Sequence, residues 1–414
     1  MNRLFKHVVI AASTAILSFG IISQVKADSV SNKQIKVGIY PDINHVTLST
    51  SANGTLFLFN DGNFNKIAEI GPKQVCTIIN KNGVMEVNCN NKSILIPKGK
   101  LILKNLAQKE KYSPLVYAVN RWYRGSIEVF PATKNPKNLT VVNTLPLEEY
   151  LYGVVPSEMP ASWPAEALKT QAIAARTYVL THLGQFAKDG FDVMPTVTSQ
   201  VYGGVEEETP VSNQAVYDTK GKVITYNSKL ISAYYYASSG GQTENGYDVW
   251  GSDIPYIKSV VDYDQDSPKF SWYKTMNNDE LQEIIKKEFN KDIGKVLKLS
   301  IIELTDAKRV KTLRIEGTNG FVDIDGKKFR MASKLNSTLF RIEPLDIGTS
   351  ILNDLPTPNL FMFIGRGWGH GAGMSQWGAR YLAKAGKTCN EILRYYYQGT
   401  EIHDADTFLA KKSR

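Results

Sequence analysis

The sequence predicts an α+β protein in which strands dominate and are mostly antiparallel, with a central helical catalytic segment and helices at the C-terminal end. Three observations predict this class. Residues 36–104 alternate apolar and polar positions between turns rich in Gly, Asn and Asp, which is typical of short antiparallel strands. Near residue 147 the apolar spacing changes to a helical period. After residue 374, two helix-capping signals follow one another.

Two helices are expected in the centre of the chain. The first has apolar residues at i, i+3, i+4 and i+7, namely Leu147, Tyr150, Leu151 and Val154. Pro156 is expected to end it, because proline cannot donate the helical hydrogen bond. The second helix is expected to start at Ser162 as N-cap, with Pro164 in its first turn. Its apolar stripe is narrow and made mostly of small residues, which lets another element approach closely: Leu168, Ala172, Ala175, Val179 and Leu183.

The remaining elements follow from the same signals. Residues 196–262 are expected to return to strands, and residues 279–289 to form a short amphipathic helix. Further strands are expected at 296–304, 310–316, 320–325 and 327–331. A helix is expected from Ser375 with Gly386 at its C-terminus, and Thr388 with Glu391 has the spacing of a capping box for a last helix that ends near Gly399.

The first residues indicate export. Arg3 and Lys6 precede an apolar run from Val8 to Ile22, and residues 25–27 read V-K-A, which suits a signal peptidase. The run is shorter than the roughly 20 residues of a membrane span. We therefore expect residues 1–27 to be a cleaved signal peptide, with a retained membrane anchor as the alternative. In both cases the protein acts outside the cytoplasm, in the cell wall or on the membrane side that faces it.

Composition excludes several classes of protein. With 43% hydrophobic and 21% charged residues the chain is an ordinary globular protein, not a disordered one. The formal charge is +9, and without residues 1–27 the chain has 46 basic and 40 acidic residues, a charge of +6. This mild excess suits an anionic wall polymer, and equally a soluble protein that avoids neutrality. The basic residues are scattered, which argues against nucleic acid as a partner.

The cysteines and histidines give little sign of a metal. Three cysteines are too few for a disulfide framework or a zinc ribbon; Cys76 and Cys89 are either paired across a hairpin or free, and Cys389 is left over. The five histidines do not stand at ligand spacing with a cysteine. We predict no metal and no cofactor.

Glu158 is the acidic residue best placed for acid–base chemistry. It lies between Pro156 and Pro160, which restrict the backbone, and Met159 and Trp163 are near enough to exclude water. Such an environment raises the pKa of a carboxyl group toward the range that a general acid needs. The alternative is a glutamate that only caps the following helix.

Glu158 belongs to a long motif. Residues 156–178 read P-S-E-M-P-A-S-W-P-A-E-A-L-K-T-Q-A-I-A-A-R-T-Y. Further runs are Y-R-G at 123–125, S-Q-V-Y-G-G at 199–204, S-S-G-G-Q-T-E at 238–244 and G-W-G-H-G-A-G-M-S-Q-W-G-A at 367–379. In this order the runs resemble the signature of the SpoIID/LytB family of bacterial cell-wall proteins, and the resemblance extends through most of the chain after the leader.

The resemblance implies a lytic transglycosylase with Glu158 as its catalytic residue. One carboxyl group protonates the glycosidic oxygen, and its carboxylate then removes the proton of the C6 hydroxyl, which closes a 1,6-anhydro ring. A second carboxylate, as used in hydrolysis, is not needed. The implied substrate is a peptidoglycan glycan strand, cleaved between MurNAc and GlcNAc after an amidase has removed its stem peptides. The implied partner is that cell-wall amidase, similar to stage II sporulation protein P, and sporulation is the implied setting.

The resemblance also implies that Arg176 lines the substrate groove, and further groove residues are predicted from the polar turns and motifs. Arg176 is expected to bind a free lactyl carboxylate of the strand. Its alternative role is a salt bridge or a contact on the helix face. The other predicted substrate-binding residues, each of which has a structural role as its alternative, are Gln200, Ser238, Ser239, Gly240 and His370. His370 could also shuttle a proton, and Tyr202 and Tyr236 could stack on sugar rings.

The sequence also leaves alternatives to the transglycosylase. The glycines at 365–373 have a dinucleotide-loop pattern, but they more readily let the backbone pass close to a sugar or another strand. A wall-binding protein that enhances an amidase without catalysis is one alternative. A glycan hydrolase that uses water, with Glu148 or Glu149 as base, is another.

The sequence divides the chain into a leader and two larger parts. Residues 28–110 are expected to form a β-rich N-terminal part. Residues 111–402 are expected to form the SpoIID/LytB-like catalytic domain, with an α+β subdomain at about 270–345.

Overall fold

The computed structural model describes residue 30 and residues 33–105, 114–349 and 356–412. Its sheets are mostly antiparallel and are combined with helices in the centre and at the C-terminal end, which confirms the predicted α+β class. The predicted leader at 1–27 lies outside the described residues. Among those that are described, no helix has the length and apolar character needed to cross a membrane.

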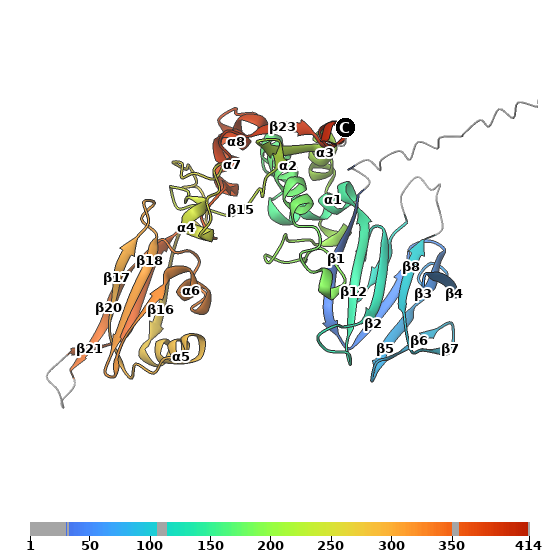
Figure 1. Cartoon of the computed structure of the whole chain (residues 1–414), viewed down its shortest axis with the longest axis horizontal. Coiled ribbons are helices and arrows are strands. Elements are labelled where there is room, and N and C mark those ends of the chain that lie inside the picture. Colours follow the sequence, from blue (N-terminus) through green and yellow to red (C-terminus); the bar gives the residue numbers. More distant parts are fainter. Residues whose placement is uncertain (1–29, 31–32, 106–113, 350–355, 413–414) are drawn as a thin grey trace, which may run out of the picture.

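Two six-stranded sheets form the N-terminal side of the molecule (Figure 1). Their orders are β1-β12-β11-β8-β3-β4 and β10-β9-β2-β5-β6-β7. The strands are β1 (Gln34–Ile43), β2 (His45–Thr50), β3 (Gly54–Asn60), β4 (Asn63–Ile70), β5 (Cys76–Lys81), β6 (Val84–Cys89), β7 (Lys92–Ile96), β8 (Lys100–Asn105), β9 (Val116–Ala118), β10 (Arg121–Tyr123), β11 (Ser126–Pro131) and β12 (Leu139–Pro146). Because β11 pairs with β8 and β12 pairs with β1, the expected division at residue 110 does not separate two sheets.

The two N-terminal sheets bury side chains in one common core. Leu48 of β2, Leu56 of β3 and Leu103 of β8 all belong to it. Cys76 and Cys89 lie opposite each other on β5 and β6 and form a disulfide, which decides between the two alternatives left open above. Cys389 is a free cysteine.

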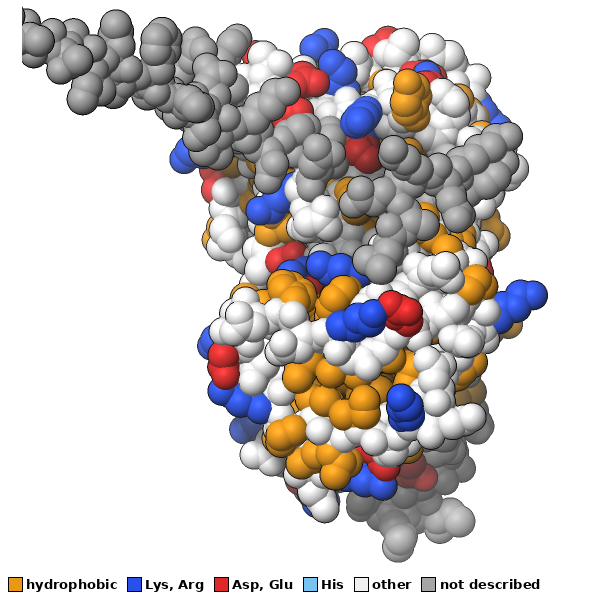
Figure 2. Space-filling view, turned by 90° about the vertical axis from the view of Figure 1, so that its right-hand side faces the viewer, with side chains coloured by type: hydrophobic (Ala, Val, Ile, Leu, Met, Phe, Trp, Pro, Cys, Tyr) orange, Lys and Arg blue, Asp and Glu red, His pale blue; other side chains and the backbone are white. Residues whose placement is uncertain are grey.

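Apolar side chains also lie on the outside of these sheets. Figure 2 shows hydrophobic side chains gathered in the lower half of the face that contains the N-terminal strands. Phe64 on β4 and Leu95 on β7 are 53% and 62% exposed. The Phe64 ring contacts those of Phe57 and Phe59 on β3, at centroid distances of 6.2 and 4.8 Å. The sheets therefore have an apolar outer surface as well as an apolar core.

The central segment contains more helix than the sequence predicted. Its elements are α1 (Leu147–Glu158), α2 (Ala165–Thr181), the 3-10 helices η2 (Ala187–Asp189) and η3 (Gly204–Glu207), α3 (Pro210–Asp218), β13 (Lys222–Tyr226), β14 (Lys229–Leu230), β15 (Tyr235–Tyr236) and α4 (Gly246–Trp250). The expectation of strands throughout 196–262 was wrong at α3 and α4. Thr209 caps α3 with its hydroxyl, and Pro210 occupies the first helical position, where its missing N–H costs no hydrogen bond.

Two predicted boundaries in this segment were also wrong. Pro156 does not end α1, because it lies in the last turn and the helix continues to Glu158, with Met159 N–H donating to Val155 O at 2.9 Å. Ser162 is not the N-cap of α2; Pro164 occupies that position without a side-chain cap. The narrow stripe on α2 is buried as expected at Leu168, Ala172, Ala175 and Val179.

The elements at the left of Figure 1 enclose a second hydrophobic core, whose buried residues lie between Trp272 and Phe363 in the sequence. It is built from β16 (Ser271–Asn277), α5 (Asn278–Phe289), β17 (Val296–Leu304), β18 (Val310–Gly317), β19 (Gly320–Asp325), α6 (Gly326–Ala332), β20 (Phe340–Thr349) and β21 (Pro356–Arg366). The strand expected at 327–331 was wrong. Residues there form α6, because the Asp325 carboxylate accepts from the N–H groups of Lys327 and Lys328 and starts a helix.

The C-terminal segment returns to the central helices. Its elements are β22 (Met374–Ser375), α7 (Gln376–Lys384), α8 (Cys389–Tyr396), β23 (Glu401–Asp404) and α9 (Ala405–Lys412). Ser375 caps α7 and Thr388 forms the predicted capping box of α8. Helix α2 contacts both α7 and α8, and β23 pairs with β13. This return brings residues near 375 to the end of α1.

Candidate active site

Glu158 is the last residue of α1 and lies where three distant segments of the chain meet. Its Oε1 accepts a hydrogen bond from the backbone N–H of Val201 at 2.8 Å. Its Oε2 accepts from Nε2 of Gln376, the first residue of α7, at 3.1 Å. Both carboxylate oxygens are therefore held by donors that the chain supplies from other elements.

The surroundings of Glu158 raise the pKa of its carboxyl group above the ordinary glutamate value. The largest cause is burial, which disfavours the charged form. The hydrogen bonds from Val201, Gln376 and Tyr235 and the positive charge of Lys269 act in the opposite direction, because they favour the carboxylate. The carboxyl group can hold a proton at a higher pH than an exposed glutamate. When the proton is lost, hydrogen-bond donors from Val201 and Gln376 face the carboxylate that forms.

Aromatic side chains flank the end of α1. Met159 is fully buried, and the Trp163 ring meets the Trp377 ring edge to face at a centroid distance of 4.9 Å. The Arg380 guanidinium lies 4.9 Å from the centroid of the Trp377 ring. The predicted apolar surroundings of Glu158 are therefore present, and Trp377 is added to them by α7.

Gln200 lies beneath this site and not in a groove. It is buried; its Oε1 accepts from the Tyr150 hydroxyl at 3.2 Å, and its Nε2 donates to the Tyr235 hydroxyl at 2.8 Å and to Ala175 O at 3.3 Å. Gln200 therefore has a structural role in place of the predicted contact with substrate. Its side chain holds the Tyr235 hydroxyl, and its backbone precedes the Val201 amide that binds Glu158.

Arg176 does not lie in a groove either. Its side chain is 0% exposed and forms a two-pronged ion pair with Glu148, with Nε to Oε1 at 2.9 Å and Nη2 to Oε2 at 2.7 Å. The remaining donors reach carbonyl oxygens of Ala172, Val216 and Lys222. This corrects the expectation that Arg176 binds a lactyl carboxylate: the salt bridge, its alternative role, is what the structure contains.

The turn at residues 238–240 faces inward. Ser238 and Ser239 are buried, and the Ser238 hydroxyl donates to Oδ2 of Asp264. The Gly240 N–H donates to the same oxygen at 2.9 Å. Gly240 has φ +80°, and a Cβ there would stand 2.7 Å from Cβ of Arg366. These three residues shape the turn against the glycine-rich loop, which differs from the predicted contact of hydroxyls and amides with a glycan.

His370 is packed among aromatic rings. Its Nδ1 accepts from the N–H of Ala372 at 3.2 Å, and its ring centroid lies 5.0 Å from Tyr236 and 5.3 Å from Trp250. Burial, followed by the charge of Arg330, lowers its pKa to about 3. The ring therefore stays neutral at neutral pH, which argues against the proton shuttle that the sequence allowed.

Neither tyrosine expected to stack on sugars is available to do so. Tyr202 is buried and its hydroxyl donates to Oδ1 of Asn143 at 2.7 Å, and Tyr236 is buried as well. The groups that do contact Glu158 were missed as individual residues. Gln376 and Val201 stand inside motifs that were recognised, but a motif does not say which of its members points at the carboxylate.

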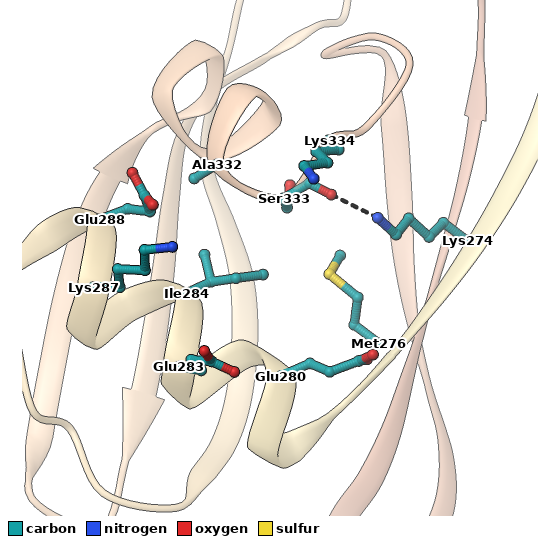
Figure 3. A pocket seen from close by; sticks show the side chains of 10 residues that line it. All are labelled: Lys274, Met276, Glu280, Glu283, Ile284, Lys287, Glu288, Ala332, Ser333 and Lys334. Atoms are coloured by element: carbon teal, nitrogen blue, oxygen red, sulfur yellow. Dashed lines mark hydrogen bonds between the residues drawn. The ribbon is translucent and has the colours of Figure 1, made fainter. Parts of the chain in front are cut away.

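A cavity of about 310 Å³ lies away from this site, between α5 and α6 (Figure 3). Lysine and glutamate side chains line much of it, and Nζ of Lys274 donates to Ser333 O at 2.7 Å. None of the residues predicted for chemistry lines it.

A metal site would need at least three acidic, cysteine or histidine side chains close together. Within the described ranges no group of three or more of them is close enough to hold an ion. That no metal takes part stays a prediction.

Comparison with known proteins shows the family to which the chain belongs. The family model described as stage II sporulation protein, SpoIID, matches residues 135–226, which include Glu158. Stage II sporulation protein D of Bacillus subtilis (strain 168) is 38% identical over 288 residues, which cover 65% of this chain and 78% of that protein. The chain belongs to the SpoIID family.

Other relatives extend the comparison. Stage II sporulation protein D of Bacillus amyloliquefaciens is 34% identical over 286 residues, covering 65% of this chain and 78% of that protein. An amidase enhancer of Bacillus subtilis (strain 168) is 33% identical over 299 residues, covering 61% of this chain but 40% of that longer protein. Residues 255–373, which contain the second core, match a model for a domain of unknown function, DUF8618.

The buried ion pair predicts a large effect of Arg176 on stability. Arg176→Ala should lower the free energy of unfolding by roughly 3–5 kcal/mol, because it leaves the Glu148 carboxylate buried without its partner. Urea denaturation measures this change. The double variant Arg176→Met/Glu148→Leu should recover part of the loss, since it removes both charges. An Arg176→Ala variant that is as stable as the wild type but binds glycan more weakly would instead support the prediction that Arg176 binds a lactyl carboxylate.

The contact between Gln376 and Glu158 predicts the direction of a pKa change. Gln376→Met removes a donor that favours the carboxylate, so the pKa of Glu158 should rise further. Carbon-13 NMR of the glutamate carboxyl carbon, titrated against pH, measures it. Gln214→Met on the exposed side of α3 is the control and should leave this pKa unchanged. A fall in the pKa of Glu158 on removing Gln376 would contradict the account.

Proposed function

We propose that the chain is an exported peptidoglycan lytic transglycosylase that cleaves the MurNAc–GlcNAc bond and leaves 1,6-anhydroMurNAc ends. The observation that carries the proposal is the environment of Glu158. This residue combines a raised pKa with hydrogen-bond donors on both carboxylate oxygens, as one group that acts first as acid and then as base requires. Family membership supports the same reading, since the family model covers this segment.

The reaction assigns two steps to Glu158. In the first, its carboxyl proton passes to the glycosidic oxygen, the bond to the muramoyl C1 breaks, and positive charge develops at C1. In the second, the carboxylate takes the proton of the C6 hydroxyl while O6 bonds to C1, so Glu158 is protonated again. The N–H groups of Val201 and Gln376 stabilise the carboxylate between the steps.

Hydrolysis with Glu148 or Glu149 as base is disfavoured by the length of α1. These residues open the helix and Glu158 ends it, so at 1.5 Å per residue they lie about 15 and 13.5 Å from it along the axis. Paired carboxylates in glycosidases are about 5–5.5 or 6.5–9.5 Å apart. Glu148 in addition forms an ion pair with Arg176.

A non-catalytic role as an amidase enhancer is the second candidate. The similarity to a protein of that name favours it. In this role the chain would bind stripped glycan strands and act on a cell-wall amidase similar to stage II sporulation protein P. Sporulation is the proposed setting, because two relatives carry it in their names.

Export is proposed from two features. The first is the leader-like run at residues 1–27. The second is the disulfide between Cys76 and Cys89, because such bonds persist in oxidising compartments outside the cytoplasm.

Glu158→Gln is the variant that tests the proposal. It keeps the size of the side chain but can neither donate nor take up the proton, so cleavage of purified strands should fall by about 10⁴-fold, the upper end for a general acid–base group. Strand binding should persist. Glu207→Gln, at an exposed glutamate of η3, is the matched control and should cleave like the wild type.

Two results separate the candidates. Cleavage by the wild type that Glu158→Gln abolishes supports the transglycosylase. A wild type that binds strands and stimulates an amidase but cleaves nothing by itself supports the enhancer. A folded Glu158→Gln variant that cleaves at the wild-type rate would contradict the role of Glu158.

A further inference from the structure

The burial of Arg176 leaves the proposed anionic strand without the cation that was expected to bind it. An exposed lysine near Glu158 offers a replacement. Lys269 is exposed, in the loop that precedes β16, and its charge acts on the Glu158 carboxyl group. Its Nζ lies 4.9 Å from the centroid of the Trp368 ring, and Trp368 is 42% exposed.

Backbone contacts tie this lysine–tryptophan pair to the catalytic carboxylate. Trp368 pairs with Ser238, with Trp368 N–H donating to Ser238 O at 2.7 Å. The next residue back, Ala237, accepts from Trp377 N–H at 3.1 Å. Trp377 follows Gln376, whose side chain binds Glu158. Trp368 and Gln376 are thus fixed to one short segment.

Lys269 differs from Arg380, a second cation that lies over a tryptophan ring. Arg380 lies over Trp377 but has a carboxylate oxygen of Asp266 at 3.7 Å. No carboxylate of the described residues lies within ion-pair distance of Lys269, and its Nζ lies over the Trp368 ring. A cation that lies over an exposed aromatic face and forms no ion pair is suited to an anionic ligand that also has an apolar face.

We propose that Lys269, placed over Trp368, binds the free carboxylate of an acidic sugar of the glycan strand, while Trp368 contacts the face of a sugar ring. This inference rests on the proposed function, because it takes the strand to be the ligand. It predicts a preference for stripped strands. When a stem peptide is attached, the lactyl carboxyl group is an amide and carries no charge for Lys269.

The test compares strands that differ in this one charge. Stripped strands, freed of phosphate-containing wall polymers, are used either with free lactyl carboxylates or after conversion of these groups to methylamides. Binding is measured with the full chain carrying Glu158→Gln, so that the strands stay intact. That protein should prefer the carboxylate strands by about tenfold, the order expected for one charge-assisted contact.

Three variants in the same background decide whether Lys269 is the cause. Lys269→Met should lose the preference and bind both strands alike, and Lys269→Arg should keep it. Lys295→Met, at an exposed lysine next to β17, is the matched control and should behave like its parent. An undiminished preference in Lys269→Met would overturn the proposal. So would a preference that is seen only while phosphate-containing polymers remain on the strands, since the anion would then be phosphate.

The transglycosylase proposal and the carboxylate site are refuted by different results. If the wild type cleaves no strand but the charge preference depends on Lys269, the transglycosylase proposal fails and the carboxylate site stands. If the wild type cleaves strands but binds both kinds alike, cleavage stands and the carboxylate site is refuted.

Discussion

The position of Glu158 depends on an ion pair at the other end of its helix. Glu148 in the first turn of α1 binds Arg176 on α2, and the same guanidinium donates to the carbonyls of Val216 on α3 and Lys222 on β13. Two charges in a buried place interact strongly and are costly to separate. The pair therefore fixes the direction in which α1 enters the bundle, and with it the place where Glu158 emerges at the far end.

Two kinds of group lie around Glu158: hydrogen-bond donors held by packing, and side chains exposed at the surface. Burial raises the pKa of Glu158, and hydrogen bonds from Val201 and Gln376 oppose the rise. These donors belong to segments that packing holds in place. The exposed cation and ring, Lys269 and Trp368, lie on loops at the surface. The proposed chemistry therefore rests on groups that packing holds in place, and the proposed recognition of the strand rests on side chains that water can reach.

Much of the fold could be predicted from the sequence, because its signals are local, and local signals also led to the prediction of Glu158. Alternation predicted the N-terminal strands, and flanking prolines together with a family motif singled out Glu158. The contacts that decide roles are not local: Gln376 is 218 residues from Glu158, and Arg176 is 28 residues from its partner. A charged residue inside a motif looks the same whether it faces substrate or a buried carboxylate. The sequence predicts a strand where α6 forms, and the cap that decides for a helix is the Asp325 carboxylate, which accepts from the N–H groups of Lys327 and Lys328.

The central claim is that one carboxyl group breaks the glycosidic bond without water. The most direct measurement is digestion of purified strands in oxygen-18 water, with the new ends identified by mass spectrometry. The account predicts 1,6-anhydro ends that are lighter than reducing ends by one water and contain no oxygen-18. New reducing ends in place of anhydro ends would show that water attacks C1, and a second base would then have to be found near Glu158.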